Sequence, residues 1–546
     1  MRKFSFLAML IVLMASNAYA DDSIDAQNEE QSPYILSPVV VTADKRAQDI
    51  QNVPSSVTAI TNKMIEDFQI EQTSDIFKVT PNVMITKVGP KGVASSFASV
   101  RGIASSMGNS PVLGVYVDDV YYPYLDMSLL DIEQIEVLRG PQGTLYGRNT
   151  EAGVINIITQ KPTQEWQSKI GGSYSSYNTR EFTASTSGQL IDDLLGFRGT
   201  FRYEASDGYF TNKFNDNDKI NNYENYDGRL RFSGTPTSRF KYDLTFDIQD
   251  YRSGGYADFA PIDSANLRKS VNVDYDGYSW KKNYVAAFRG QYDWDDMTLL
   301  SVTSFKKDQS VWDNDTDFGP IDIYRIHATY DTTNISQELR LSSTNESSPF
   351  QWLIGGYGYY EEDERGASTR MNLDNMGMTG MGIATSLNKG TIDTTGAAIF
   401  GQGTYTFFDD LDLTLGLRYE HLYRKLDYEM DMGAAGPIFG MDNVSGTNNK
   451  KFDALLPKIA LSYRINENIK PYASVSRGFR EGGFNITNQI GTSYDSEFTW
   501  NYEIGTKTQW LNNALTLNLA AFWIDWKDRQ VEILSPDGSS FYIQNA

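Results

Sequence analysis

The sequence predicts an antiparallel β-barrel of the outer-membrane type with a small α+β domain ahead of it, and three observations lead to this fold class. Runs of about 9–11 residues alternate apolar and polar side chains, which is the length of a tilted strand that crosses a bilayer. Short turns alternate with long polar loops, an asymmetry typical of such barrels. Aromatic residues make up 13% of the chain, with 34 Tyr, which suits the interfacial girdles of a membrane barrel.

The overall composition excludes several classes of function. The 546 residues carry a formal net charge of −22, which argues against a nucleic-acid partner because such a partner needs a basic face. There is no Cys, so disulfides and thiolate chemistry are absent. The two His, His327 and His421, are far apart, so a zinc or haem site built on them is not expected. No metal motif or nucleophile–base constellation is visible, so we expect neither an enzyme nor a cofactor bound by the protein itself.

The first 43 residues predict export and a flexible lead segment. Residues 1–20 have the charged start, short apolar core and A-x-A site of a signal peptide cleaved after Ala20. No later stretch approaches 18 apolar residues, so any membrane crossing must use strands. Residues 21–43 are expected to be flexible. Their β-branched run 36–43 contains Pro38, which argues against a central strand and is compatible with strand addition to a partner.

Residues 44–162 predict the α+β domain. A strand is expected near 53–60, followed by a helix capped by Thr61 or Asn62. The stretch 132–162 begins as an alternating strand, breaks at two glycine-rich turns and re-enters a strand before the barrel begins.

Three arginines of this domain, Arg101, Arg139 and Arg148, each lie beside a glycine in or next to an apolar strand. A buried guanidinium needs a partner, so these residues are candidates for ion pairs. The glycine-rich loops match no phosphate-binding pattern, which argues against nucleotide binding.

Residues 163–546 predict the barrel. In runs such as 242–249 and 411–420 the polar side is charged, so we expect it to face water. The pattern predicts about 15 strands, with a sixteenth beginning at 539–546, whereas a plugged barrel needs about 22. We therefore expect a C-terminally truncated chain with an incomplete barrel of 15–16 strands.

Several motifs resemble one family, the TonB-dependent outer-membrane receptors, and in particular those that take siderophores. Residues 135–147 (IEVLRGPQGTLYG) and 153–159 (GVINIIT) resemble the signature of the family's plug domain, which would fill the barrel lumen. Residues 475–485 and 501–507 resemble its barrel segments. The TonB box, which pairs with the periplasmic protein TonB, is matched by Ser37, Pro38, Val39, Val40, Val41, Thr42 and Ala43.

The resemblance implies active import of a scarce, bulky ligand across the outer membrane, with an iron(III) chelate, a ferric siderophore, as the expected cargo. TonB, working with ExbB and ExbD, would supply the energy, and outer-membrane lipid would surround the barrel. Cobalamin, haem, nickel chelates and oligosaccharides remain open as cargo. From other classes, a passive porin and a secreted β-rich glycan-active enzyme remain open.

The resemblance also suggests roles for single residues. Plug arginines are held by barrel glutamates in the family pattern, which here suggests Arg101 and Arg139 with Glu420 and Glu503. Ligand contacts are expected, from position alone, at Phe97, Tyr121, Tyr122 and Tyr124. Those aromatic rings could equally anchor the plug in the barrel.

Overall fold

The computed structural model describes residues 39–88, 95–105, 110–125, 127–255, 270–345, 347–486, 492–534 and 541–546. The predicted signal peptide, Ser37 and Pro38 lie outside these residues. Within the described part of the chain, no helix is long and apolar enough to cross a membrane.

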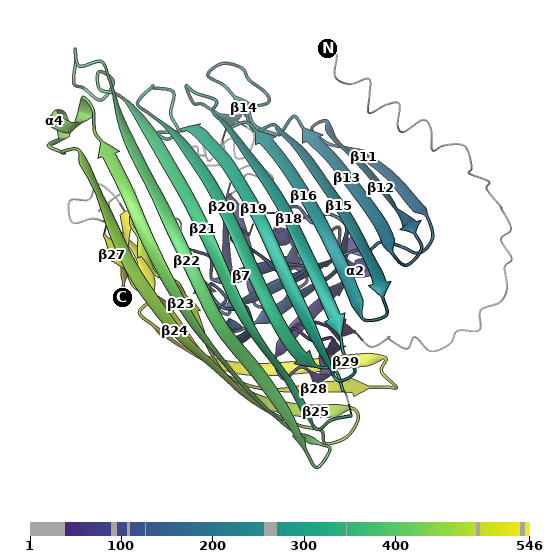
Figure 1. Cartoon of the computed structure of the whole chain (residues 1–546). Helices are drawn as coiled ribbons and strands as arrows, with labels where there is room; N and C mark the ends of the chain where they lie inside the picture. The colour runs from purple at the N-terminus through teal and green to yellow at the C-terminus, as the bar shows by residue number, and fades with distance from the viewer. Residues whose placement is uncertain are drawn as a thin grey trace, which may run out of the picture.

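One antiparallel sheet of 15 strands dominates the molecule (Figure 1). Strands that are neighbours in this sheet follow one another along the chain and pair antiparallel, which confirms the predicted antiparallel sheet. Short turns such as 408–410 lie at one end, called here the short-turn end, and longer loops such as 373–382 at the other, the long-loop end. The strands are β11 (Gln167–Ser175), β12 (Thr179–Ile191), β13 (Leu195–Ser206), β15 (Tyr223–Thr237), β16 (Phe240–Ser253), β18 (Tyr278–Asp293), β19 (Met297–Asp315), β20 (Tyr324–Ser343), β21 (Phe350–Asn372), β22 (Ile383–Phe407), β23 (Leu411–Asp431), β24 (Val444–Tyr463), β25 (Ile469–Arg480), β28 (Glu497–Trp510) and β29 (Leu515–Lys527).

The long loops contain short elements of their own. The predicted sixteenth strand is not part of the main sheet, because β31 pairs with β30 in a separate hairpin that satisfies their backbone groups. These elements are β14 (Thr211–Asn212), β17 (Ser270–Val271), α4 (Ala435–Phe439), β26 (Gly483–Phe484), β27 (Ser493–Tyr494), β30 (Gln530–Leu534) and β31 (Phe541–Asn545).

The inner face of the main sheet is buried, which corrects the expectation that it faces water. On β23, Leu415 and Leu417 are about half exposed on the outer side, at 52% and 50%. On the inner side Arg418 and Glu420 are only 2% and 1% exposed. The alternation itself was predicted, but a folded domain and not solvent covers the charged face.

That domain is the predicted plug. Its central sheet has the order β3-β9-β10-β7-β8, with one parallel pair, β10 with β7, and a smaller sheet has the order β4-β5-β6. Its elements are β1 (Val40–Val41), β2 (Gln48–Asp49), η2 (Ile50–Asn52), β3 (Ser56–Thr61), α2 (Asn62–Asp67), η3 (Thr73–Lys78), β4 (Val83–Val88), β5 (Ser95–Val100), β6 (Ile103–Ala104), β7 (Leu113–Val117), β8 (Val120–Tyr122), β9 (Ile132–Arg139), α3 (Gly143–Tyr146) and β10 (Gly153–Thr159).

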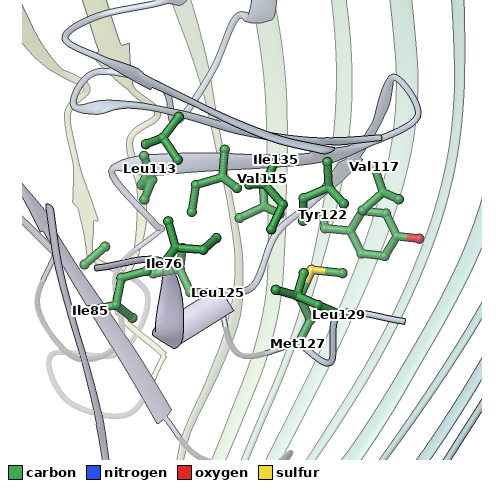
Figure 2. Packing of buried hydrophobic residues seen from close by; sticks show 14 of the residues in the cluster. Ile76, Ile85, Leu113, Val115, Val117, Tyr122, Leu125, Met127, Leu129 and Ile135 are labelled. Atoms are coloured by element: carbon green, nitrogen blue, oxygen red, sulfur yellow. The ribbon is translucent and has the colours of Figure 1, made fainter. Parts of the chain in front are cut away.

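The plug has its own hydrophobic core. As predicted, the Thr61 side chain caps α2 by accepting a hydrogen bond from the Met64 amide. Figure 2 shows apolar side chains from β7, β9, η3 and β4 meeting, among them Val115, Ile135 and Ile76, all fully buried. The sheet that contains most of residues 132–162 is therefore a rigid support for the groups at its ends.

The plug lies inside the curve of the main sheet (Figure 1). Ion pairs tie it to strands far apart around the wall: Arg198 of β13 contacts Asp131 at 2.5 Å, and Arg101 of the plug contacts Glu503 of β28 at 2.6 Å.

Candidate functional site

A cavity of about 610 Å³ opens between the plug and the wall on the long-loop side. The plug contributes its floor, and its sides come from β18, strands β20 to β23, the loop after β25 and the β30–β31 hairpin. Four cationic and four anionic side chains line it, although the whole chain has a net charge of −22. These are Arg148, Lys281, Arg365 and Arg424, with Glu361, Asp363, Glu481 and Glu532.

Arg148 forms the charged centre of the cavity floor. Its guanidinium donates to Glu361 at 3.0 Å and to Glu481 at 2.9 Å, and stacks 4.1 Å from the ring centre of Tyr359. Burial lowers the pKa of Arg148, but the carboxylates of Glu361 and Glu481 outweigh burial and raise it. The residue therefore stays cationic while facing the cavity.

Glu481 connects this floor to the wall. Burial raises the pKa of its carboxyl, but Arg148 and Arg424 outweigh burial and hold it at about 2. Arg424 lies 3.7 Å from Glu481 and donates to the Gly482 carbonyl at 2.7 Å. The floor is thus a preorganised set of fixed charges, able to hold a charged polar ligand without first reorganising.

Three of the four aromatic residues predicted to contact ligand line this cavity: Phe97, Tyr121 and Tyr124. The Tyr121 ring lies 5.4 Å from the Arg148 guanidinium, and Lys281 lies 3.8 Å from the centre of the Tyr124 ring. Tyr122 is a correction. It follows Tyr121 on β8 and so points to the opposite face, where it packs in the plug core and donates to Asp247.

Of the residues predicted to form plug–barrel ion pairs, only Arg101 and Glu503 pair with each other. Arg101 donates to Glu503 at 2.6 Å, with both side chains 2% exposed. Arg139 corrects the prediction, because among the described residues it has no ion pair and donates instead to the Pro81 carbonyl at 3.1 Å. Arg101 already occupies the neighbouring carboxylate.

Glu420 is also a correction, because its partner is Arg418 on the same strand, at 2.7 Å. Its contact with the plug is steric. A Cβ on Gly147 would stand 2.7 Å from Glu420 Oε2 and 2.5 Å from Arg418 Nη2, and the backbone there has φ +81°. Only glycine fits where this pair presses on the plug.

A second set of ion pairs was not predicted from the sequence, and in it the arginine belongs to the barrel and the carboxylate to the plug. Barrel arginines hold plug aspartates: Arg340 contacts Asp119 at 3.4 Å, and Arg198 donates to Asp131 through two nitrogens. Both aspartates have positive φ, 71° and 60°. In the sequence they look like ordinary turn residues, which is why their charge partners were not foreseen.

At the short-turn end, the described part of the proposed TonB box is packed against the plug, which corrects the expectation of flexibility for residues 39–43. Val40 and Val41 pair with β2, and Val41 and Ala43 are fully buried. The Thr42 amide donates to Glu136 at 2.7 Å, and Gln134 donates to the Val40 carbonyl at 2.9 Å.

The residues that follow this segment join it to the wall. Lys45 donates to Glu338 of β20 at 2.7 Å, and Lys458 of β24 donates to Asp44 at 2.8 Å. Burial lowers the pKa of Lys45, against the attraction of Glu338. All four side chains are at most 10% exposed, so this attachment is shielded from solvent.

Comparison with known proteins agrees with this architecture. Residues 49–154 match a family model described as the TonB-dependent receptor plug domain, and residues 203–546 match the TonB-dependent receptor-like β-barrel. The pesticin receptor of Yersinia pestis is 25% identical over 92% of this chain and 72% of its own length. The ferric-pyoverdine 358 receptor of Pseudomonas putida is 24% identical over 89% and 60%. The crystal structure of the ferric yersiniabactin uptake receptor FyuA from Yersinia pestis superposes with a TM-score of 0.78 at 21% identity, covering 90% of this chain and 74% of that one.

Proposed function

Because the chain belongs to the TonB-dependent receptors of the Gram-negative outer membrane, we propose that it imports a ferric siderophore, with the cavity above Arg148 as the binding site. The family consists of transport receptors and not of enzymes. The iron(III) chelate is cargo, and we infer no cofactor bound by the protein itself.

The cavity is the observation that carries the proposal. Its volume of about 610 Å³ lies in the range of about 300–1,000 Å³ usual for small-molecule sites. Cationic groups at its floor and sides suit the carboxylate, catecholate or hydroxamate oxygens of an iron chelate. Aromatic rings beside them, Tyr121 and Tyr124, offer flat apolar contact.

TonB would act on the plug at the short-turn end, opposite the cavity. We propose that residues 37–43 are the TonB box and that TonB, driven by ExbB and ExbD, adds to it as a strand. For that to happen, Val40 and Val41 must leave β2 and Thr42 must leave Glu136. Ligand in the cavity would favour the released state, and the pull of TonB would then displace the plug.

The relatives leave the identity of the siderophore open, so the test uses a panel. Purified protein is titrated with ferric yersiniabactin, ferric pyoverdine and cobalamin, and uptake of ⁵⁵Fe from the binding chelate is followed in cells with and without TonB. We expect one ferric chelate to bind and its uptake to require TonB. Binding of cobalamin alone, or uptake without TonB, would overturn the proposal.

Two substitutions locate the site. Arg148→Gln should weaken binding at least about tenfold, since a charge-assisted contact contributes about 1.5–3 kcal/mol. Lys281→Gln tests the cavity wall, because the Lys281 ammonium lies 3.8 Å from the centre of the Tyr124 ring among the lining residues. Arg239→Gln is the matched control, because this arginine is 51% exposed and lies in a turn at the short-turn end. Equal affinity of all four proteins would place the ligand elsewhere.

A passive porin makes the contrary prediction. The plug is tied to the wall by buried pairs such as Arg101–Glu503 and Lys45–Glu338, which argues for a lumen occupied by the plug. Conductance across a planar bilayer distinguishes the porin from the plugged receptor. A steady open current from the intact chain would favour the porin.

A further inference from the structure

Three carboxylates converge at the long-loop end, away from the cavity. Asp274 lies between β17 and β18, Asp315 is the last residue of β19, and Asp317 lies in the following turn. One oxygen from each lies within 4.8 Å of the others. We call these three residues the rim cluster. In the sequence, Asp315 and Asp317 form an Asp-x-Asp pattern, from which no metal site was predicted.

The rim cluster lies outside the apolar band that faces lipid. Along β19 the outward side chains Met297 and Phe305 are exposed and apolar, whereas Lys307 and Gln309 continue the same face as polar residues. Asp315 lies ten residues beyond Phe305, roughly 33 Å along a strand.

Two oxygens of the cluster are buried without a donor. Asp315 is 5% exposed, and its Oδ2 has no hydrogen-bond partner among the described residues. The Asp274 side chain is 7% exposed, and its Oδ1 likewise has none. A buried carboxylate oxygen that lacks any donor is costly, and it is the arrangement that a cation would satisfy.

The remaining oxygens are fixed by the backbone and one arginine. Asp315 Oδ1 accepts from the Asp317 and Phe318 amides at 3.0 and 3.1 Å. Asp317 accepts from Gly319, Ile323 and Tyr324 amides at 2.7–3.1 Å. Arg325 Nη2 donates to Asp274 Oδ2 at 2.7 Å and lies 3.4 Å from Asp322. When all three carboxyls are ionised, their charge exceeds that of the one arginine by about two, which a divalent ion would compensate.

We propose that the rim cluster binds Ca²⁺ and thereby joins the loop before β18 to the loop after β19. Calcium takes oxygen ligands at about 2.3–2.6 Å, so ligands on opposite sides of the ion stand up to about 5 Å apart, and it tolerates irregular geometry. The two segments already meet through the Asp274 amide and the Gly319 carbonyl at 3.0 Å. The ion would add a second, stronger link between them.

The test is calcium titration calorimetry on the full chain, refolded in detergent so that no lipopolysaccharide supplies its own calcium sites. We expect one saturable site with a dissociation constant in the range of about 10⁻⁴–10⁻³ M or tighter, typical of extracellular calcium modules. Calcium should also slow hydrogen exchange in both joined segments, 272–277 and 316–323.

Two substitutions and a control make the result decisive. Asp315→Asn keeps the Oδ1 acceptor of the turn and replaces only the orphan oxygen, so the fold should persist while calcium affinity falls at least about tenfold. Asp274→Asn tests the other segment in the same way. Asp218→Asn removes one charge from an exposed position in a neighbouring loop and should leave calcium binding unchanged. Absence of saturable binding in the native chain, or native affinity in both cluster variants, would overturn the proposal. Neither result would bear on import through the cavity.

Discussion

The two ends of the plug use charge in different ways. At the short-turn end, Asp44 and Lys45 each have a buried partner on the wall, and Thr42 is bound to Glu136 within the plug. At the long-loop end, Arg148 has two partners and still lines an open cavity. The first arrangement resists separation, because breaking a buried pair leaves a charge without solvent or partner. The second leaves charged surface available to a ligand. Attachment and the proposed ligand binding are therefore placed at opposite ends of the plug.

The largest expected effect comes from reversing the charge of a plug residue that forms a buried ion pair with the wall. Arg101→Glu would place a carboxylate against Glu503, where both side chains are 2% exposed. Such a break costs about 3–5 kcal/mol, so the thermal midpoint should fall and cells should admit large antibiotics that the plugged lumen excludes. Arg239→Glu, at an exposed position, serves as the control. Unchanged stability and permeability in Arg101→Glu would mean that this pair does not hold the plug.

A smaller effect is expected from releasing the proposed TonB box alone. Glu136 accepts from the Thr42 amide at 2.7 Å, from Gln134 at 3.0 Å and from Asn156 at 3.1 Å. Glu136→Ala removes these contacts and should lower the local opening free energy of residues 39–46 by about 2–3 kcal/mol. Exchange of the Thr42 amide should accelerate, and a TonB C-terminal fragment should bind without ligand.

Glu133→Ala is the matched control for that experiment, because Glu133 lies on the same strand but is exposed. If Glu136→Ala leaves both exchange and TonB binding at the native level, the contact with Glu136 does not restrain the segment.

The sequence predicted the repeating parts of this molecule better than its contacts. Strand alternation in 411–420 predicted a two-faced wall because alternation is a local pattern, whereas 135–147 indicated the plug only through its resemblance to the family signature. The contacts between the plug and the inner face could not be predicted from local patterns, since Lys45 and Glu338 meet across 293 positions. Tyr121 and Tyr122 show the limit most simply: adjacent strand residues face opposite ways, and only the assembled fold determines which one meets the cavity.

The smallest expected effect is a pH dependence of the stability that Glu481 contributes at the cavity floor. The pKa of Glu481 is held at about 2, below its ordinary 4.5, so its pairing stabilises the fold fully above pH 4.5 and is lost as the pH falls toward 2. Glu481→Gln should therefore cost about 2 kcal/mol at pH 7, and the difference from the native chain should shrink between pH 4.5 and 2. Chemical unfolding at pH 7 and pH 3 measures this, with Glu467→Gln in an exposed turn as control. A difference that stays constant with pH would mean that Glu481 contributes through shape and not through charge, and the cavity floor would then lack the fixed electrostatics that distinguish it from the attached end.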